Sequence, residues 1–341
     1  MNESILQRYC DEFNSGRELP EADGIAFFDA LLAEQDEALL SDLFTAWRNK
    51  GTTTNEIYTL AEIMRDRCIR VKSRHESFVD VVGTGGSRTK TFNVSTAASF
   101  VVAGAGIAVA KHGNRAATSK SGSADVLSAL GIEPAMEPAV AERCLNEIGI
   151  CFMFAPKFHA LSAVLAKVRR ELGFATIFNN LGPLCNPAGA PHQLIGVYDP
   201  SLVEKTANAL ARLGTKRSWV VHGEDGLDEI SLNGKTVVAE IEDMSVRTFE
   251  ISAADFGMNA APLNGLRAES PAASAEVVRE VLEGKRTDSA AESLVLINAA
   301  AAIYLTGRAE TLSDAAALAL ESIKNGGAHA KLSELANASA K

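Results

Sequence analysis

The segment from residue 78 to 130 constrains the fold more than any other, because it repeats one pattern twice. The apolar run Phe78 to Val82 ends in glycines, and an apolar helix is predicted from about 96 to 103. The run Ile107 to Ala110 ends in polar residues, and a second helix is predicted from 123 to 130. Repeated strand, loop and helix units are typical of a parallel sheet, which binds ligands at the carboxyl ends of its strands.

Both loops of this segment carry residues that suit phosphate groups. The sequence GTGG at 83–86 lets backbone N–H groups approach an anion closely, and the next helix begins near Asn93 with free N–H donors. The second loop has a fixed positive charge at Lys111 and a Ser/Gly-rich helix start at 119–123. Each feature alone is commonly a tight turn or a helix cap, so the prediction of two anion-binding loops depends on their occurrence together.

The rest of the chain divides into a helical start and an alternating remainder. Residues 1 to about 72 show helical stripes, including a capping box from Thr53 to Glu56. Beyond residue 77, further strands are predicted at 150–154, 218–222, 236–241 and 246–251, and further helices at 274–283, 291–305 and 313–325. The Gly/Pro-rich stretch 179–189 is predicted to be an irregular loop.

An acidic loop follows the strand predicted at 218–222. Its sequence, GEDGLDE at 223–229, holds four acids within six residues. A solvated acidic turn would explain the spacing alone. With phosphates expected across the same cleft, a magnesium site is the better interpretation, since Mg²⁺ is commonly held by one or two carboxylates plus substrate phosphates.

Composition narrows the classes of function. The net charge is −10, which argues against broad binding to nucleic acid, and the charge is spread along the chain. The five cysteines are scattered without C-x-x-C pairing, which indicates reduced thiols. No apolar stretch suits a membrane span and residues 1–19 lack a signal-peptide segment, so a cytoplasmic protein is expected.

Long motifs make the sequence similar to a known family. They are GTGGxxxxTFNVST, KHGNRxxTSKSGSADVLxALG, VRRELGxxTIFNxLGPLxNPAG and VHGxDGLDEIS. The chain resembles the anthranilate phosphoribosyltransferases of tryptophan biosynthesis over nearly its whole length. The resemblance implies an α/β fold with a small N-terminal helical domain, residues 1–74 joined by a helical segment around 160–190. It also implies a larger domain, residues 75–341, with a mostly parallel central sheet flanked by helices.

The resemblance also implies an activity and a set of site residues. The activity is magnesium-dependent transfer of the phosphoribosyl group from 5-phosphoribosyl 1-diphosphate to anthranilate, by a homodimer formed through the helical domain. No acid or base is required, and Lys111 would act electrostatically. The donor-binding residues would be Gly83, Thr84, Gly85, Gly86, Asn93, Ser95, Thr96, Lys111, Ser119 and Ser123. The acceptor-binding residues would be Gly83, His112, Asn114, His159 and Arg169, and the metal residues Ser95, Asp228 and Glu229.

The chain departs from the family pattern at a few positions. Ser87 follows GTGG where the family usually has an acid, residues 159–162 read HALS rather than HPAM, and Lys167 replaces a common proline. With these departures, the motifs support the donor chemistry better than they support the identity of the acceptor. The alternatives are a phosphoribosyltransferase with another aromatic acceptor, a pyrimidine nucleoside phosphorylase, and a non-enzymatic relative that binds nucleic acid.

Overall fold

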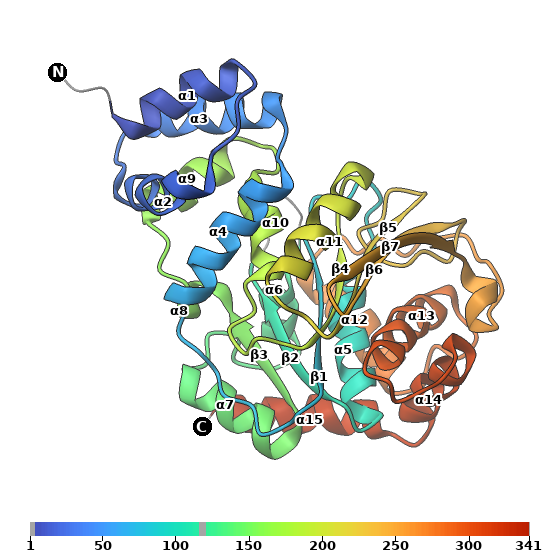
Figure 1. Ribbon diagram of the computed structural model, residues 1–341. Helices are drawn as coiled ribbons and strands as arrows, with labels where there is room; N and C mark the ends of the chain where they lie inside the picture. Colours follow the sequence, from blue (N-terminus) through green and yellow to red (C-terminus); the bar gives the residue numbers. More distant parts are fainter. Residues whose placement is uncertain (1–3, 116–120, 341) are drawn as a thin grey trace.

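The computed structural model describes residues 4–115 and 121–340, and a seven-stranded sheet forms its centre (Figure 1). The strand order is β3-β2-β1-β4-β5-β6-β7. The first five strands are parallel, and β6 and β7 run antiparallel to their neighbours. The strands are β1 (Phe78–Gly83), β2 (Ala108–Gly113), β3 (Ile150–Phe154), β4 (His192–Gly196), β5 (Arg217–Gly223), β6 (Thr236–Glu242) and β7 (Ser245–Ile251). The predicted α/β class is confirmed.

Alternate side chains of the sheet enter two hydrophobic cores on its two faces, as the strand period of two requires. Leu194 and Trp219 enter one core, and their neighbours Ile195 and Val220 enter the other. The helices of the first core are α5 (Val94–Gly104), α6 (Ser123–Ala129), α7 (Pro138–Ile148), α8 (Ala155–Phe158), α12 (Pro271–Leu282), α13 (Ala290–Leu305), α14 (Leu312–Lys324) and α15 (Gly327–Ser339). Across the described residues, none of the helices has both the length and the apolar character needed to cross a bilayer.

The second core joins the sheet to the helical part at the top of Figure 1. It contains residues of α11 (Val203–Arg212), which packs on the sheet, and of two segments distant in sequence. These are α1 (Ile5–Asn14), α2 (Gly24–Ala33), α3 (Glu37–Lys50) and α4 (Thr54–Arg67), and later α9 (Ala163–Glu171) and α10 (Ile177–Leu184). The division into domains at residue 74 remains a proposal, with α9 and α10 completing the smaller one.

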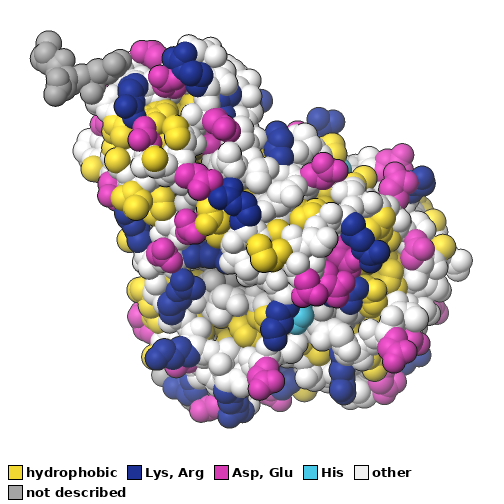
Figure 2. Space-filling model, viewed as in Figure 1, with side chains coloured by type: hydrophobic (Ala, Val, Ile, Leu, Met, Phe, Trp, Pro, Cys, Tyr) yellow, Lys and Arg dark blue, Asp and Glu magenta, His cyan; other side chains and the backbone are white. Residues whose placement is uncertain are grey.

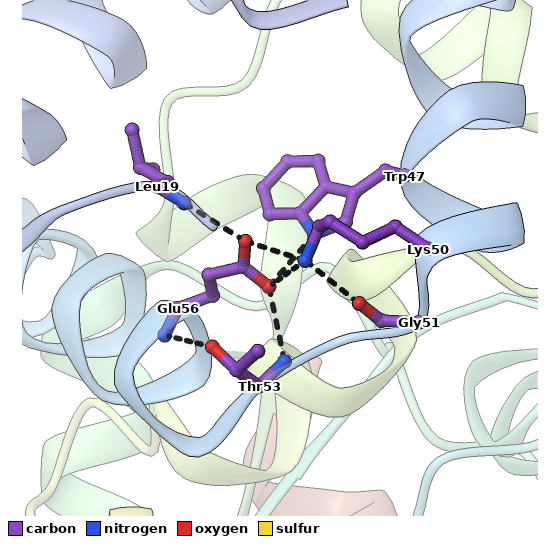
Figure 3. A network of polar contacts seen from close by, with 6 residues as sticks. All are labelled: Leu19, Trp47, Lys50, Gly51, Thr53 and Glu56. Atoms are coloured by element: carbon purple, nitrogen blue, oxygen red, sulfur yellow. Dashed lines mark hydrogen bonds and ion pairs between the residues drawn. The ribbon is translucent and has the colours of Figure 1, made fainter. Parts of the chain in front are cut away.

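A buried carboxylate holds the helical part together (Figure 3). Glu56 lies on α4 and completes the capping box with Thr53, as predicted. Its oxygens also accept hydrogen bonds from the Leu19 backbone N–H at 3.0 Å and the Trp47 indole N–H at 3.0 Å. The Lys50 ammonium donates to both oxygens, at 2.8 and 2.9 Å. One side chain therefore connects α3, α4 and the segment after α1.

The prediction of an irregular loop at 179–189 was wrong in its first half. Residues 177–184 form α10, although Gly182 and Pro183 lie within it. The helix forms because Phe178, Leu181 and Leu184 are buried in the second core, and this tertiary packing outweighs poor helix propensity. Strand β4 and helices α7, α11 and α15 were not predicted. Helix α5 begins two residues before the predicted start.

Candidate active site

A cavity of about 410 Å³ opens at the carboxyl ends of β1 and β2, between the sheet and the helical part. Both predicted anion-binding loops line it, and so does the end of the acidic loop. The predicted residues on its wall are Gly83, Thr84, Gly85, Gly86, Asn93, Ser95, Lys111, His112, Asn114, Ser123, His159, Arg169, Asp228 and Glu229. Thr96 is fully buried in α5, off the wall. Ser119 lies outside the described residues.

The GTGG loop is shaped by its contacts with Asp228. Gly85, with a φ of +65°, donates its N–H to Asp228 Oδ2 at 2.9 Å. A Cβ atom on Gly83 would lie 2.8 Å from the same oxygen, so only glycine allows this approach. On the other side of the loop, the Tyr198 N–H donates to Thr84 Oγ1 at 3.0 Å. These contacts hold the loop with its backbone toward the cavity.

Asp228 and Glu229 bring a buried pair of carboxylates to the cavity. Burial raises the pKa of Asp228, and burial together with the Asp228 charge raises that of Glu229 well above its usual range. Glu229 Oε2 is buried without a hydrogen-bond partner in the structure. Two adjacent carboxylates with a free oxygen form a site that a cation would stabilise. The other acids of the loop face elsewhere: Asp225 accepts from Ser231 Oγ at 2.6 Å and Glu224 from the Lys235 N–H at 3.2 Å.

Lys111 lies at the floor of the cavity, where it is 4% exposed. Its ammonium donates to the Val81 carbonyl at 2.6 Å and to Ser95 Oγ at 3.3 Å. Burial lowers the pKa of Lys111 to about 8, while the charges of Asp80 and Glu229 favour its protonated form. Lys111 thus presents a positive charge between the GTGG loop and the acidic pair.

Asn93 joins the two anion-binding loops. Ser121 Oγ from the second loop donates to Asn93 Oδ1 at 2.9 Å, and Ser274 Oγ from α12 donates to the same atom at 2.8 Å. Helix α5 begins directly after Asn93, so its first N–H groups have no partner within the helix. On the second loop, Ser123 Oγ donates to the Asn114 carbonyl at 3.2 Å. The predicted arrangement of two helix starts at one cavity is confirmed.

Two neutral histidines lie at the end of the cavity nearest α10. His112 Nδ1 donates to the Gly182 carbonyl at 3.0 Å, which leaves Nε2 as an acceptor, and this buried atom has no partner. His159 Nε2 donates to the Cys185 carbonyl at 3.0 Å. Burial lowers the pKa of His112 to about 3 and that of His159 to about 4. Both rings are therefore uncharged at neutral pH.

Arg169 projects from α9 into the same end of the cavity. Its guanidinium lies 4.8 Å from the centre of the Phe178 ring, and its buried Nε has no hydrogen-bond partner. Burial lowers the pKa of Arg169 to about 10, so the group stays cationic at neutral pH. Within residues 4–115 and 121–340, no carboxylate forms an ion pair with it. The group is suited to an anionic ligand.

Comparison with known proteins agrees with this cavity. Residues 75–329 match the family model described as "Glycosyl transferase family, a/b domain". An anthranilate phosphoribosyltransferase of Moorella thermoacetica is 47% identical over 329 residues, which cover 96% of each chain. The chain belongs to the anthranilate phosphoribosyltransferase family. Its activity is the transfer of a phosphoribosyl group to anthranilate in tryptophan biosynthesis.

Solved structures of anthranilate phosphoribosyltransferases share the whole fold. The crystal structure of the Thermus thermophilus enzyme has a TM-score of 0.89 and 35% identity, and the match covers 98% of this chain and 99% of that one. The Saccharomyces cerevisiae enzyme in complex with PRPP and Mg has a TM-score of 0.88 and 28% identity, with 99% of both chains covered. The interpretations as a nucleoside phosphorylase or a nucleic-acid-binding relative are therefore set aside.

The departures from the anthranilate phosphoribosyltransferase pattern have local explanations. Ser87 is buried and its hydroxyl donates to the Thr89 carbonyl at 3.0 Å. Burial raises the pKa of nearby Asp228 and Ser87 partly offsets that rise, whereas an acid there would repel the carboxylate. Lys167 does not line the cavity and instead pairs with Glu37 of α3 at 2.7 Å. Neither residue removes a group that the cavity presents to its ligands.

Sequence reasoning missed several residues of the cavity. Asn179 lines it and donates to the Thr84 carbonyl at 3.2 Å, but it was assigned to an irregular loop. Lys90 adds a cation near Asp228. Beneath the floor, buried Asp80 accepts from Asn186 Nδ2 at 2.7 Å and from the His112 N–H at 3.2 Å. A charged residue inside the apolar run at 78–82 was the available signal for Asp80.

Proposed function

We propose that the cavity residues divide the transfer between a donor end and an acceptor end. The phosphates of 5-phosphoribosyl 1-diphosphate would lie against the GTGG loop, the start of α5 and the second loop. Lys111 supplies positive charge between them. Backbone N–H groups at helix starts favour anions, and a buried ammonium strengthens that preference in a low dielectric. The proposal is supported by the position of both loops on one cavity wall.

Magnesium fits the carboxylate pair. Ser95, Asp228 and Glu229 would hold it, as the unpartnered Glu229 oxygen favours a cation at this place. Bound there, the metal would neutralise charge on the diphosphate. Three or more His, Cys, Asp or Glu side chains do not cluster around any point among the described residues, so the protein offers few ligands of its own. Such a site depends on substrate phosphates, as is common for Mg²⁺.

Anthranilate would bind at the α10 end. Its carboxylate pairs with the Arg169 guanidinium, whose planar donors match a carboxylate bidentately. Its amine lies toward His112 Nε2, the acceptor atom without a partner. The remaining assigned residues, Asn114 and His159, complete this end of the wall. One cation and one acceptor thus correspond to the two polar groups of the substrate.

The chemical step is a displacement at the anomeric carbon. The amine nitrogen supplies the electron pair for the new C–N bond, while the C–O bond to pyrophosphate breaks and its electrons leave with the pyrophosphate. The nitrogen then loses a proton to solvent, and neutral His112 Nε2, a weak base with a pKa of about 3, would orient the amine by accepting a hydrogen bond from it. Most of the rate enhancement would come from positioning the two substrates and from stabilising the negative charge on the leaving pyrophosphate.

The test follows anthranilate fluorescence after mixing the protein with anthranilate, 5-phosphoribosyl 1-diphosphate and Mg²⁺. The fluorescence should fall only when all three are present. Asp228→Asn with Glu229→Gln should reduce the rate by at least about 1000-fold while the circular dichroism spectrum is retained, because both metal carboxylates are lost. Asp225→Asn, in the same loop but off the wall, is the matched control. Undiminished magnesium-dependent turnover in the double variant would refute the metal assignment.

Two further proposals concern the protein's state in the cell. The helical part is proposed to mediate a homodimer: apolar side chains gather on it in Figure 2, and Ile25 of α2 is 60% exposed. A cytoplasmic location is proposed because all five cysteines are free thiols, as is usual in a reducing compartment.

A further inference from the structure

A second cavity, of about 380 Å³, lies where the helical part meets the α/β part, and it shares no lining residue with the active-site cavity. Its walls come from the end of α3, the segment before α10, and the start of α11. Its volume falls within the range of about 300–1,000 Å³ that is typical of small-molecule sites. The start of α10, Ile177 and Phe178, separates the two cavities.

The charged residues of this second cavity favour a monoanion. Arg48 and Lys205 line it, together with one carboxylate, Asp199. Asp199 already accepts a hydrogen bond from the Ser201 N–H at 2.9 Å. Neither Arg48 nor Lys205 pairs with a carboxylate in the described part of the chain. The cavity therefore holds a net charge of +1, two cations against one carboxylate, with both cations available to a ligand.

Aromatic side chains form the other walls of the second cavity, and contacts within the protein hold some of them in place. The Arg48 guanidinium lies 4.4 Å from the centre of the Phe174 ring, which keeps it at the cavity. The Trp47 ring is held by its hydrogen bond to Glu56 (Figure 3). Phe44 and Tyr198 add further apolar surface. A flat ring that carries a negative group would meet aromatic faces and cations together.

A free hydroxyl adds a third polar group. Thr176 lines the cavity and is 6% exposed, yet its Oγ1 has no hydrogen-bond partner. Helix α10 starts at the next residue, and of its first N–H groups that of Asn179 already donates to the Thr176 carbonyl at 2.9 Å. A buried polar atom without a partner costs free energy that a bound ligand would recover.

Two contacts connect this cavity to the active site. Tyr198 donates its N–H to Thr84 of the GTGG loop at 3.0 Å, and its ring lies beside Gly86. On the other side, the Phe44 ring meets Phe178 edge-on, with centres 6.2 Å apart, and Phe178 lies beneath Arg169. A ligand that shifts Tyr198 would therefore act on the GTGG loop, and one that shifts Phe44 would act on Phe178 and Arg169 at the other end.

We propose that this second cavity is a regulatory site for a small aromatic carboxylate, bound by Arg48, Lys205 and Thr176. The binding is independent of the proposed function. Its effect on catalysis depends on the donor and acceptor roles proposed above.

The probe is benzoate, with binding measured by calorimetry and by Trp47 fluorescence in a Trp219→Phe background, which leaves Trp47 as the only tryptophan. The wild type should bind two benzoates per chain. Arg48→Ala with Lys205→Ala should weaken one site at least tenfold, with the change in Trp47 fluorescence lost. Arg169→Ala should weaken only the other. The matched control, Arg308→Ala with Lys324→Ala, removes two exposed cations that line neither cavity.

Kinetics separate the regulatory effect from competition with the substrate. At saturating anthranilate, benzoate should change the KM for 5-phosphoribosyl 1-diphosphate at least twofold in the wild type. In Arg48→Ala with Lys205→Ala, turnover without benzoate should be normal and this change absent. If Arg48→Ala with Lys205→Ala weakens no benzoate site, whether the chain binds one benzoate or two, the proposal is overturned. Equally tight binding of inorganic phosphate to the second site would refute the aromatic carboxylate as its ligand class. If benzoate binds as expected but the wild type shows no turnover, the proposed function is refuted, and the binding result can still be interpreted.

Discussion

Arg169 is the residue whose surroundings carry the most information about the acceptor. The Arg169 Nε is buried and unpartnered, and the Phe178 ring supports the guanidinium, so the group is unfavourable unless a ligand completes it. By contrast, residues proposed to bind the donor are already hydrogen-bonded within the protein, as Lys111 is to Ser95 and Asn93 to Ser121. The two ends of the cavity should therefore respond differently when single residues are changed.

Arg169→Ala should lower kcat/KM for anthranilate by about 10- to 100-fold, the usual cost of losing a charge-assisted hydrogen bond. The KM for 5-phosphoribosyl 1-diphosphate should change less than threefold, because Arg169 is proposed to pair with the carboxylate of the acceptor and not with the donor. Initial rates with each substrate varied in turn measure both effects. Arg170→Ala, an exposed residue of the same helix, should match the wild type. An equal loss for both substrates would make Arg169 a structural residue.

Single residues were predictable where chemistry is local in sequence. The GTGG loop, Lys111 and the Asp228–Glu229 pair each lie at or after the carboxyl end of a strand, and the rule for parallel sheets brings such positions together. The partnership between Asp80 and Asn186 was not predictable, because 106 positions separate them and no periodicity connects them. The orientation of His112 was equally hidden, since it depends on a carbonyl 70 positions away.

Among the secondary-structure elements, α3 and α4 depend on the Glu56 carboxylate (Figure 3). Lys50 is 4% exposed and Glu56 is fully buried, so each charge needs the other. Breaking a buried pair by removing one partner is far more costly than replacing both.

Glu56→Gln should reduce the free energy of unfolding by about 3–5 kcal/mol, since it leaves the Lys50 ammonium buried without a counter-charge. Urea unfolding followed by circular dichroism measures the change. Adding Lys50→Met should restore part of the loss, because the unpaired charge is then gone. If the double variant is less stable than Glu56→Gln alone, the buried charge is not the cause.

The elements that escaped prediction are those set by tertiary packing. Helix α10 contains Pro183 and is held by the second core rather than by its own propensity. Strand β4 has only five residues, His192–Gly196, and is buried throughout, so no alternation of polar and apolar side chains marks it. The long amphipathic and alanine-rich helices were recognisable because their pattern is intrinsic to the sequence.

For the whole molecule, the exposed apolar surface of the helical part leads to a prediction about assembly. The chain should sediment as a species of about 72 kDa, twice the chain mass of 36.0 kDa. Burial of apolar surface between two copies would supply the free energy of dimerisation. Sedimentation velocity over a range of concentrations measures the mass of the sedimenting species. A 36.0 kDa species at every concentration would contradict the proposed dimer.

Whole-molecule stability should fall in acid because of the buried histidines. The pKa of His159 is about 4 in the folded protein and near 6.5 in the unfolded chain, so the unfolded state binds more protons between these values. Stability is complete above pH 6.5 and is lost as the pH falls toward 4. The loss is at most about 1.4 kcal/mol per pH unit for this group. Urea unfolding at several pH values should give a shallower slope in His159→Gln, and identical slopes would refute the assignment.

The hydrogen bond between Gly85 and Asp228 also has a consequence for how the protein is made. The two residues are 143 positions apart, and Asp228 follows β5, which pairs with β4. A nascent chain on the ribosome therefore exposes its glycine loop long before the carboxylate that shapes it has been synthesised. A chain truncated before residue 228 would lack the carboxylate that shapes the GTGG loop, even if its first strands fold. The loop can therefore reach its final conformation only late in translation.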